Sequence, residues 1–142
     1  MEKKITSADL RIDLISGKSK EYSKWFLACL LFGHPIQQEV AKRTYLEFEK
    51  SKIISPGDVV NAGWNRLVKV LDKGHYVRYD YSTATKLINI SKQLLHDYGS
   101  VKRMITFSKN RNDLKARLLK FNGIGPKTGS IFIKELEKYK IV

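Results

Sequence analysis

The fold is decided by the stretch Leu118-Leu119-Lys120-Phe121-Asn122-Gly123-Ile124-Gly125-Pro126-Lys127-Thr128, which lies near the end of a chain of 142 residues. It places a Gly-x-Gly turn between two segments whose apolar residues have helical spacing. The two glycines let the main chain approach another group closely. Pro126 suits the first turn of a helix, because the N–H that proline lacks is not needed there. The stretch therefore predicts two helices joined by a tight hairpin over about residues 111–138, with Ile124 anchoring the hairpin in the core.

The rest of the chain is also predicted to be helical. Only three prolines occur, and each lies at a predicted boundary. Residues 20–32 are too densely apolar for a surface helix, which predicts a central, buried one. We expect an all-α fold, a compact multi-helix bundle in which residues 1–142 form a single domain. The further helices are predicted at residues 7–15, 36–50, 58–63, 64–71, 82–98, 101–106, 111–120 and 126–139.

Local signals predict some details of these helices. Ser82 or Thr83 is expected to cap the long helix, and residues 75–81 before it are expected to be irregular or briefly extended. Trp25 and Trp64 stand in apolar contexts and are expected in the core. The residues of the 36–50 helix expected to face inward are Val40, Thr44, Leu46 and Phe48.

Charge is the strongest compositional signal. The chain has 27 Lys and Arg against 14 Asp and Glu, a net charge of +13, and a pI near 9.8. Residues 102–142 hold eleven of the basic residues against three acidic ones, and so carry +8 of that total. Such an excess favours a polyanionic partner, with nucleic acid first and an anionic membrane surface second. The alternative is an alkaline protein with no nucleic-acid partner.

The composition also excludes several classes of protein. Cys29 is the single cysteine, so there is no intramolecular disulfide and no iron–sulfur cluster. One cysteine and three scattered histidines do not make a zinc site, and we expect no metal or cofactor. No run approaches the roughly 18 apolar residues of a membrane span, and the start lacks the apolar core of a signal peptide. We expect a cytoplasmic protein, nucleoid-associated or nuclear according to the organism; the oligomeric state stays open.

The predicted hairpin suits the backbone of DNA. Its N–H groups and the positive end of the following helix would face an anion. Contacts of this kind hold the backbone and carry no base-sequence information. The alternative is an ordinary corner between two helices with glycine at a cap.

The hairpin resembles a helix-hairpin-helix motif, and residues 20–138 are similar to the helical domain of the endonuclease III-like, or HhH-GPD, DNA glycosylase superfamily. The stretch FLACLLFGHPIQQEVAKRTYLEF resembles the early buried helix of that family, its loop and the next helix. The stretches WNRLVKVLDKGHYVRYDYSTATKLINISKQLLHDYG and LLKFNGIGPKTGSIFIKEL follow in the family's order. The resemblance implies a bundle ending in a helix-hairpin-helix, double-stranded DNA, damaged or abasic, as the partner, and a role in base-excision repair.

Lys127 stands where the bifunctional members of that family have their nucleophile. The resemblance implies that it attacks the sugar C1′ of a damaged nucleotide and forms a Schiff base, which requires a lowered pKa. The alternative is a lysine that contacts a phosphate. The DNA-binding residues implied in this segment are Lys120, Gly123, Ile124, Gly125, Lys127 and Thr128.

The sequence departs from the family at the catalytic aspartate. In the family this residue follows the hairpin lysine, but no Asp occurs here after Asp113. Glu135 and Glu137 lie on the second helix of the hairpin and are poor substitutes, and the family's C-terminal return helices have no counterpart. We therefore expect either a piece of a longer glycosylase or a short relative, a non-catalytic module that binds double-stranded or structured DNA.

Two further segments are candidates for DNA contact. His34, between Gly33 and Pro35, stands where the family places a residue that enters the duplex in place of a flipped base; the alternative is an exposed loop histidine. In residues 76–81, aromatic side chains would stack on a base, Arg78 would meet a phosphate and Asp80 would substitute for the missing acid. The alternative is that this segment caps and packs the next helix.

A third hypothesis for the whole chain is a basic scaffold that binds RNA or a protein.

Overall fold

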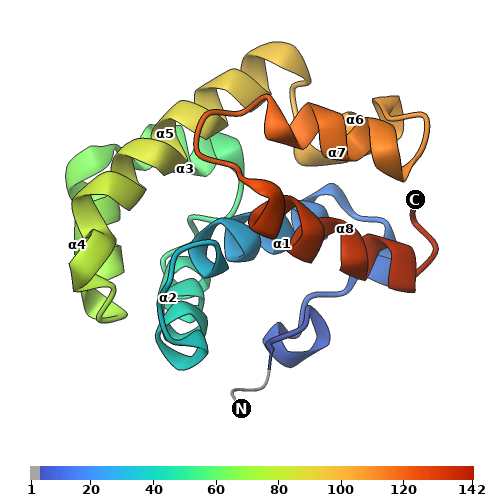
Figure 1. The fold of residues 1–142 in the computed structure, drawn as a ribbon. Helices are drawn as coiled ribbons and strands as arrows, with labels where there is room; N and C mark the ends of the chain where they lie inside the picture. Colours follow the sequence, from blue (N-terminus) through green and yellow to red (C-terminus); the bar gives the residue numbers. More distant parts are fainter. Residues whose placement is uncertain (1–3) are drawn as a thin grey trace.

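The computed structural model describes residues 4–142, and every regular element among them is helical, which confirms the predicted all-α class (Figure 1). The elements comprise three short 3-10 helices and eight α-helices. The 3-10 helices are η1 (Ala8–Leu10), η2 (Leu14–Ser16) and η3 (Val77–Tyr79). The α-helices are α1 (Ser19–Phe32), α2 (Gln38–Lys50), α3 (Pro56–Ala62), α4 (Trp64–Lys73), α5 (Asp80–Asp97), α6 (Val101–Phe107), α7 (Arg111–Leu119) and α8 (Pro126–Lys138).

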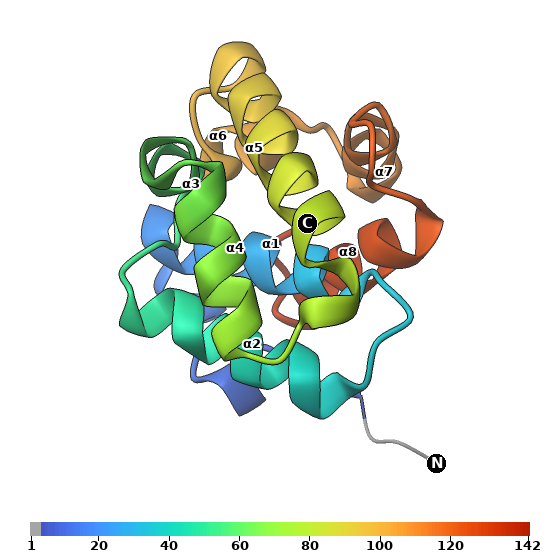
Figure 2. The same ribbon diagram turned by 90° about the vertical axis from the view of Figure 1, so that its left-hand side faces the viewer.

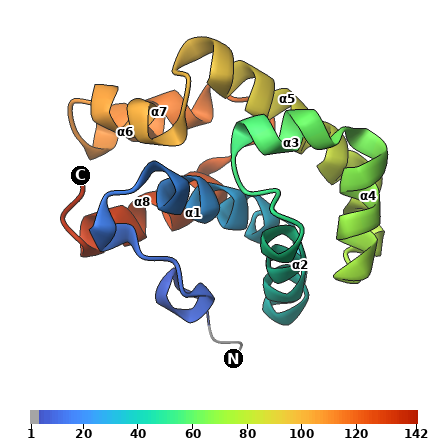
Figure 3. The same ribbon diagram turned by 180° about the vertical axis from the view of Figure 1, so that it is seen from behind.

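Helix α1 is the centre of the packing, as its apolar sequence predicts. It contacts α2, α6 and α8, and Figure 3 shows it between α8 and α2. Trp25 is fully buried, and its Nε1 donates a hydrogen bond to the carbonyl oxygen of Phe132 in α8 at 3.3 Å. The ring of Phe26 meets the ring of Phe132 edge-on, with 5.6 Å between the centroids. Cys29 is also buried, and burial raises the pKa of its thiol.

A second group of helices covers the other side of α1. Helix α5 packs on α3 and α4, and α4 packs on α2 (Figure 2). The start of α3 is a capping box, in which Ser55 Oγ accepts from the Asp58 N–H and Asp58 Oδ2 accepts from the Ser55 N–H, both at 3.1 Å. This capping box starts α3 at Pro56, two residues before the start that the sequence predicts.

The prediction of one helix over residues 7–15 is wrong. The segment forms η1 and η2 instead, separated by Arg11 with a positive φ of 58°. Leu10, Ile12 and Leu14 are all buried, and a spacing of two residues does not fit one face of an α-helix. The segment is tied to α8, because the backbone N–H and the hydroxyl of Ser7 both donate to Glu135 Oε1, at 2.8 and 2.6 Å.

Other details also differ from the prediction. Helix α5 begins at Asp80, so neither Ser82 nor Thr83 caps it. Trp64 is 38% exposed, because it begins α4 and its Nε1 bonds to the hydroxyl of Thr85. Leu46 is 42% exposed. The buried face of α2 follows the helical spacing of Ala41, Thr44, Tyr45 and Phe48, which brings in Tyr45 and leaves Leu46 on the outside.

Gly74, at the end of α4, lies in direct contact with Thr44 of α2. A Cβ at this position would lie 2.1 Å from Thr44 Oγ1 and 2.5 Å from Thr44 Cα. The Gly74→Ala variant is therefore expected to lose about 1–3 kcal/mol of unfolding free energy, because the backbone of α2 must move. Urea unfolding followed by circular dichroism measures this loss. Gly57→Ala is the matched control, since its Cβ would meet only Ser55 Oγ at 3.8 Å; equal stability of the two variants would contradict the packing.

Candidate nucleic-acid interface

The α7–α8 hairpin, residues 120–125 with the helix ends beside them, is closed by a tight turn. The N–H of Ile124 donates to the carbonyl oxygen of Phe121 at 3.1 Å. Gly123, the third residue of this turn, has a φ of +104°, which glycine adopts without strain. Phe121 and Ile124 are buried, so the predicted anchoring of the hairpin by Ile124 is confirmed. The rest of the turn is held at the surface by these two side chains.

The hairpin exposes donors and positive charge together. Lys120, Gly123, Gly125 and Lys127 are exposed, and Pro126 begins α8. Within residues 4–142, no group accepts a hydrogen bond from the backbone N–H of Gly123, Gly125 or Lys127. Unpaired amides at the start of a helix, with lysines beside them, form an arrangement that binds an anion.

Thr128 has a different position from its neighbours. It is buried, and its Oγ1 lies only 2.2 Å from where a Cβ of Gly33 would be. The glycine thus allows the loop after α1 to lie directly against the first turn of α8. Thr128 fixes this contact inside the protein, and the hairpin surface is left to its exposed neighbours.

Lys127 is the second residue of α8 and lies at the edge of a pocket of about 360 Å³ whose walls include Trp25, Phe32 and Ile131. Among the described residues, no carboxylate forms an ion pair with it. The two glutamates on the same helix have structural partners. Glu135 accepts from Ser7, and Glu137 pairs with Arg111 at 3.2 Å.

His34 forms a cluster with Tyr79 and Lys86, here called the His34 cluster. The imidazole stacks on the ring of Tyr79 at 4.8 Å between centroids and 15° between planes, and its Nε2 lies 3.0 Å from Lys86 Nζ. Burial, followed by the positive charge of Lys86, lowers the pKa of His34 to about 4. The imidazole is therefore neutral at neutral pH, and its Nε2 accepts from the lysine. It is packed against other side chains and does not project alone from the loop.

Lys86 is a residue that the sequence analysis did not single out. It lies on the same face of α5 as the buried Thr83, Leu87 and Ile90. A lysine at this position of an apolar helical pattern is the feature of the sequence that could have identified it. Burial lowers the pKa of Lys86 to about 8. Its stem lies on the hairpin, since a Cβ at Gly123 would be 2.8 Å from Lys86 Cγ and Cδ.

Residues 76–81 pack in the way the structural alternative predicts. Tyr76 is fully buried and donates to the carbonyl oxygen of Leu31. Tyr81 lies against Trp64. Asp80 begins α5 and accepts from the Tyr81 N–H at 2.7 Å. The guanidinium of Arg78 remains exposed, 5.3 Å from the centroid of the Tyr79 ring.

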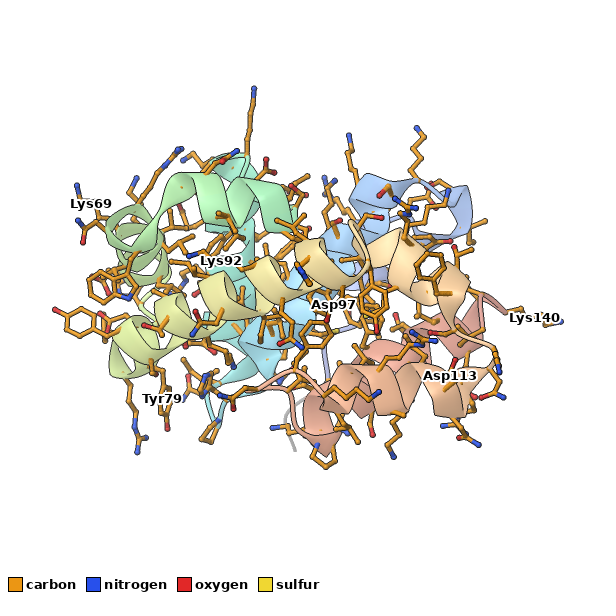
Figure 4. The ribbon with its side chains drawn as sticks, turned by 90° about the horizontal axis from the view of Figure 1, so that it is seen from above. Lys69, Tyr79, Lys92, Asp97, Asp113 and Lys140 are labelled. Carbon is orange, nitrogen blue, oxygen red and sulfur yellow. The ribbon has the colours of Figure 1, made fainter. Side chains whose placement is uncertain are left out.

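A continuous series of contacts therefore joins two of the candidate residues, Arg78 and His34, to the hairpin. Arg78 lies over Tyr79, Tyr79 stacks on His34, and His34 contacts Lys86. The stem of Lys86 covers Gly123 of the hairpin. Figure 4 shows Tyr79 on the same side of α5 as the loop that leads into α8. Segments far apart in the sequence thus form one surface.

Comparison of the chain with models of protein families, with curated proteins and with solved structures finds no match. In the part of the chain that the structure describes, no three His, Cys, Asp or Glu side chains are grouped to hold a metal ion. No helix there is long and apolar enough to span a membrane.

The lowered pKa of His34 gives the stability a pH dependence. The unfolded imidazole binds a proton below about pH 6.5, whereas the folded one does so only near pH 4. Stability is therefore full above pH 6.5 and falls as the pH is lowered toward 4. Between pH 7 and 4.5, wild type is expected to lose about 1 kcal/mol more than His34→Phe, after allowance for solvent screening. Urea unfolding at both pH values checks this; the same loss in both proteins would contradict it.

Proposed function

We propose that this protein binds double-stranded DNA, capturing phosphates with the α7–α8 hairpin, and that it acts on damaged or abasic duplexes in the manner of a base-excision-repair glycosylase or lyase. The observation that carries this proposal is the group of unpaired amides at Gly123, Gly125 and Lys127, exposed beside two lysines. The net charge of +8 over residues 102–142 supplies the long-range attraction.

In this proposal the hairpin holds the backbone and the His34 cluster lies beside it. The amides and the positive end of α8 bind phosphate oxygens, while Lys120 and Lys127 add charge. Backbone contacts of this kind fix the position of the duplex but do not select a base sequence. Recognition of a lesion would then depend on the surface from His34 to Arg78, which adjoins the hairpin.

A second candidate is a module that binds DNA without chemistry. It is favoured by the exposure of Lys127, since a nucleophilic lysine is activated by burial or by nearby cations. It is favoured also by Glu135 and Glu137, whose carboxylates are held by Ser7 and Arg111. Equal affinity for intact and abasic duplexes would support this second candidate.

A pair of glycine variants tests backbone capture. A Cβ at Gly125 meets nothing within 4 Å in the free protein, so Gly125→Ala is expected to fold but to obstruct an approaching phosphate. Its affinity for a 20-base-pair duplex should fall about tenfold, or about 1.4 kcal/mol. Gly129→Ala is the matched control, because its Cβ also meets nothing within 4 Å and it lies inside α8. Fluorescence anisotropy gives both affinities, and equal binding by the two variants would refute the proposed phosphate site.

The two exposed lysines are expected to act through charge. Replacing Lys120 with alanine should weaken binding to every duplex sequence alike and reduce the slope of log K against log salt by about one. Lys69 on α4 provides the control, since it is also exposed and lies toward the far end of the molecule (Figure 4). A salt titration of Lys69→Ala should reproduce the wild-type slope. If both variants lower the slope equally, binding is spread over the whole surface.

A further inference from the structure

Tyr98, Arg103, Phe107 and Arg117 form a surface cluster, here called the Phe107 cluster, where the end of α5 meets α6 and α7 (Figure 1). The rings of Tyr98 and Phe107 lie 6.2 Å apart between their centroids. The guanidinium of Arg103 lies 5.8 Å from the centroid of the Phe107 ring. That of Arg117 lies 5.7 Å from the centroid of the Tyr98 ring. Each of the two rings therefore has a cation beside it.

The ring of Phe107 is accessible to a ligand. Its side chain is 50% exposed, and α6 is anchored in the core by Val101, Met104 and Ile105 instead. A single exposed apolar side chain is ordinary on a protein surface. An exposed aromatic ring with arginines beside it, however, is the arrangement on which the bases of nucleic acids stack.

The charge around the Phe107 cluster is mostly positive. Residues 97–120 hold seven Lys and Arg against two acidic residues, Asp97 and Asp113. Asp113 pairs with Arg117 at 3.3 Å, and Asp97 contacts the histidine that precedes it. In the part of the chain that the structure describes, no carboxylate forms an ion pair with Arg103. A phosphate at the cluster would therefore meet a guanidinium that no acid neutralises.

The Phe107 cluster continues into the α7–α8 hairpin along α7. Arg117 and Lys120 are three residues apart, so they are neighbours on one side of the helix, separated by about 4.5 Å along its axis. The N–H of Lys120 donates to the carbonyl oxygen of Arg117 at 3.3 Å. Lys120 is also one of the exposed lysines beside the hairpin amides. A strand that leaves a duplex held at the hairpin thus meets the cluster within about one helical turn.

The exposed ring favours unpaired bases over paired ones. Within a duplex, both faces of each base are covered by its neighbours in the stack, so no face is free for Phe107. An unpaired base has a free face, and aromatic side chains bind it with little dependence on sequence. The ring and the uncompensated arginine therefore fit single-stranded DNA.

We propose that the Phe107 cluster binds single-stranded DNA that emerges from a duplex held at the hairpin, with a base stacked on Phe107 and the adjoining phosphate on Arg103. Tyr98 supports the Phe107 ring, and Arg117 extends the positive surface toward Lys120. This inference rests on the proposed binding of duplex DNA. It names the form of DNA that the protein prefers, a junction between paired and unpaired strands.

A forked duplex tests this preference. The fork has the 20 base pairs of the blunt duplex and about six unpaired thymidines on each strand at one end. In fluorescence anisotropy, the wild-type chain is expected to bind the fork about tenfold more tightly than the blunt duplex, a gain that one stacked base can supply. Phe107→Leu keeps an apolar side chain but loses the ring, so most of this gain should disappear. Phe107→Trp keeps a ring and should retain it.

Affinity for the blunt duplex controls for folding of the two variants. Both are expected to bind it as wild type does, because the Phe107 cluster does not contact paired DNA in this proposal. A side chain that serves only the packing of α6 would not change the ratio of the two affinities.

Arg103→Gln tests the phosphate contact separately. Loss of one contact to a single strand should reduce the slope of log K against log salt by about 0.7 for the fork and leave the slope for the blunt duplex unchanged. Arg43→Gln is the matched control, since it removes an exposed arginine from α2, and both slopes should stay as in wild type. An equal fall on the two probes would overturn the contact of Arg103 with the unpaired strand.

The remaining outcomes separate this inference from the proposed function. Equal affinity of wild type for the fork and the blunt duplex overturns the inference and leaves duplex binding standing. A gain that persists in Phe107→Leu also overturns it, because the unpaired strand is then held elsewhere. Binding of the fork without binding of the blunt duplex, with loss in Phe107→Leu, overturns the proposed function and leaves the stacking surface. Failure to bind either probe overturns both.

Discussion

The burial of α1 is the constraint on which the rest of the structure depends. The helix is apolar on all sides, so no face of it is stable in water, and other helices must cover it completely. Helices α2, α6 and α8 pack directly on it, and the hydrogen bond from Trp25 Nε1 to the Phe132 carbonyl oxygen ties the middle of α8 to it. Together with the close approach of Gly33 to Thr128, this contact positions the first turns of α8, and therefore the hairpin amides. The candidate site is in this sense a consequence of core packing.

The N-terminal segment also holds α8 in place, through Ser7. Ser7 supplies two hydrogen bonds to the buried carboxylate of Glu135, which would otherwise be costly inside the protein. Glu135 is therefore a structural residue of α8. A chemical role for it would require breaking the contact that ties the first turns of the chain to the last helix.

Most of the helices were predictable from the sequence because their signals are local. Apolar spacing, glycine stops and prolines indicated α1 to α8 within a few residues, and the tight turn with Ile124 buried was predicted as well. The errors concern tertiary context. The 7–15 segment follows contacts to α8 that no local pattern shows, and Trp64 is exposed because of where α4 begins. At the site, the sequence indicated the hairpin and His34 separately. The contact of both with Lys86 depends on how α5 crosses them, and periodicity alone does not give that crossing.

Cys29, the single cysteine of the chain, allows the opening of the packing around α1 to be measured by its rate of reaction. Cys29 is buried among the helices that cover α1, and its raised pKa keeps it in the unreactive thiol form. A thiol reagent reaches it only when those helices separate. Its labelling rate therefore reports how often the core opens, and slower labelling in the presence of a ligand measures how strongly that ligand holds the helices together.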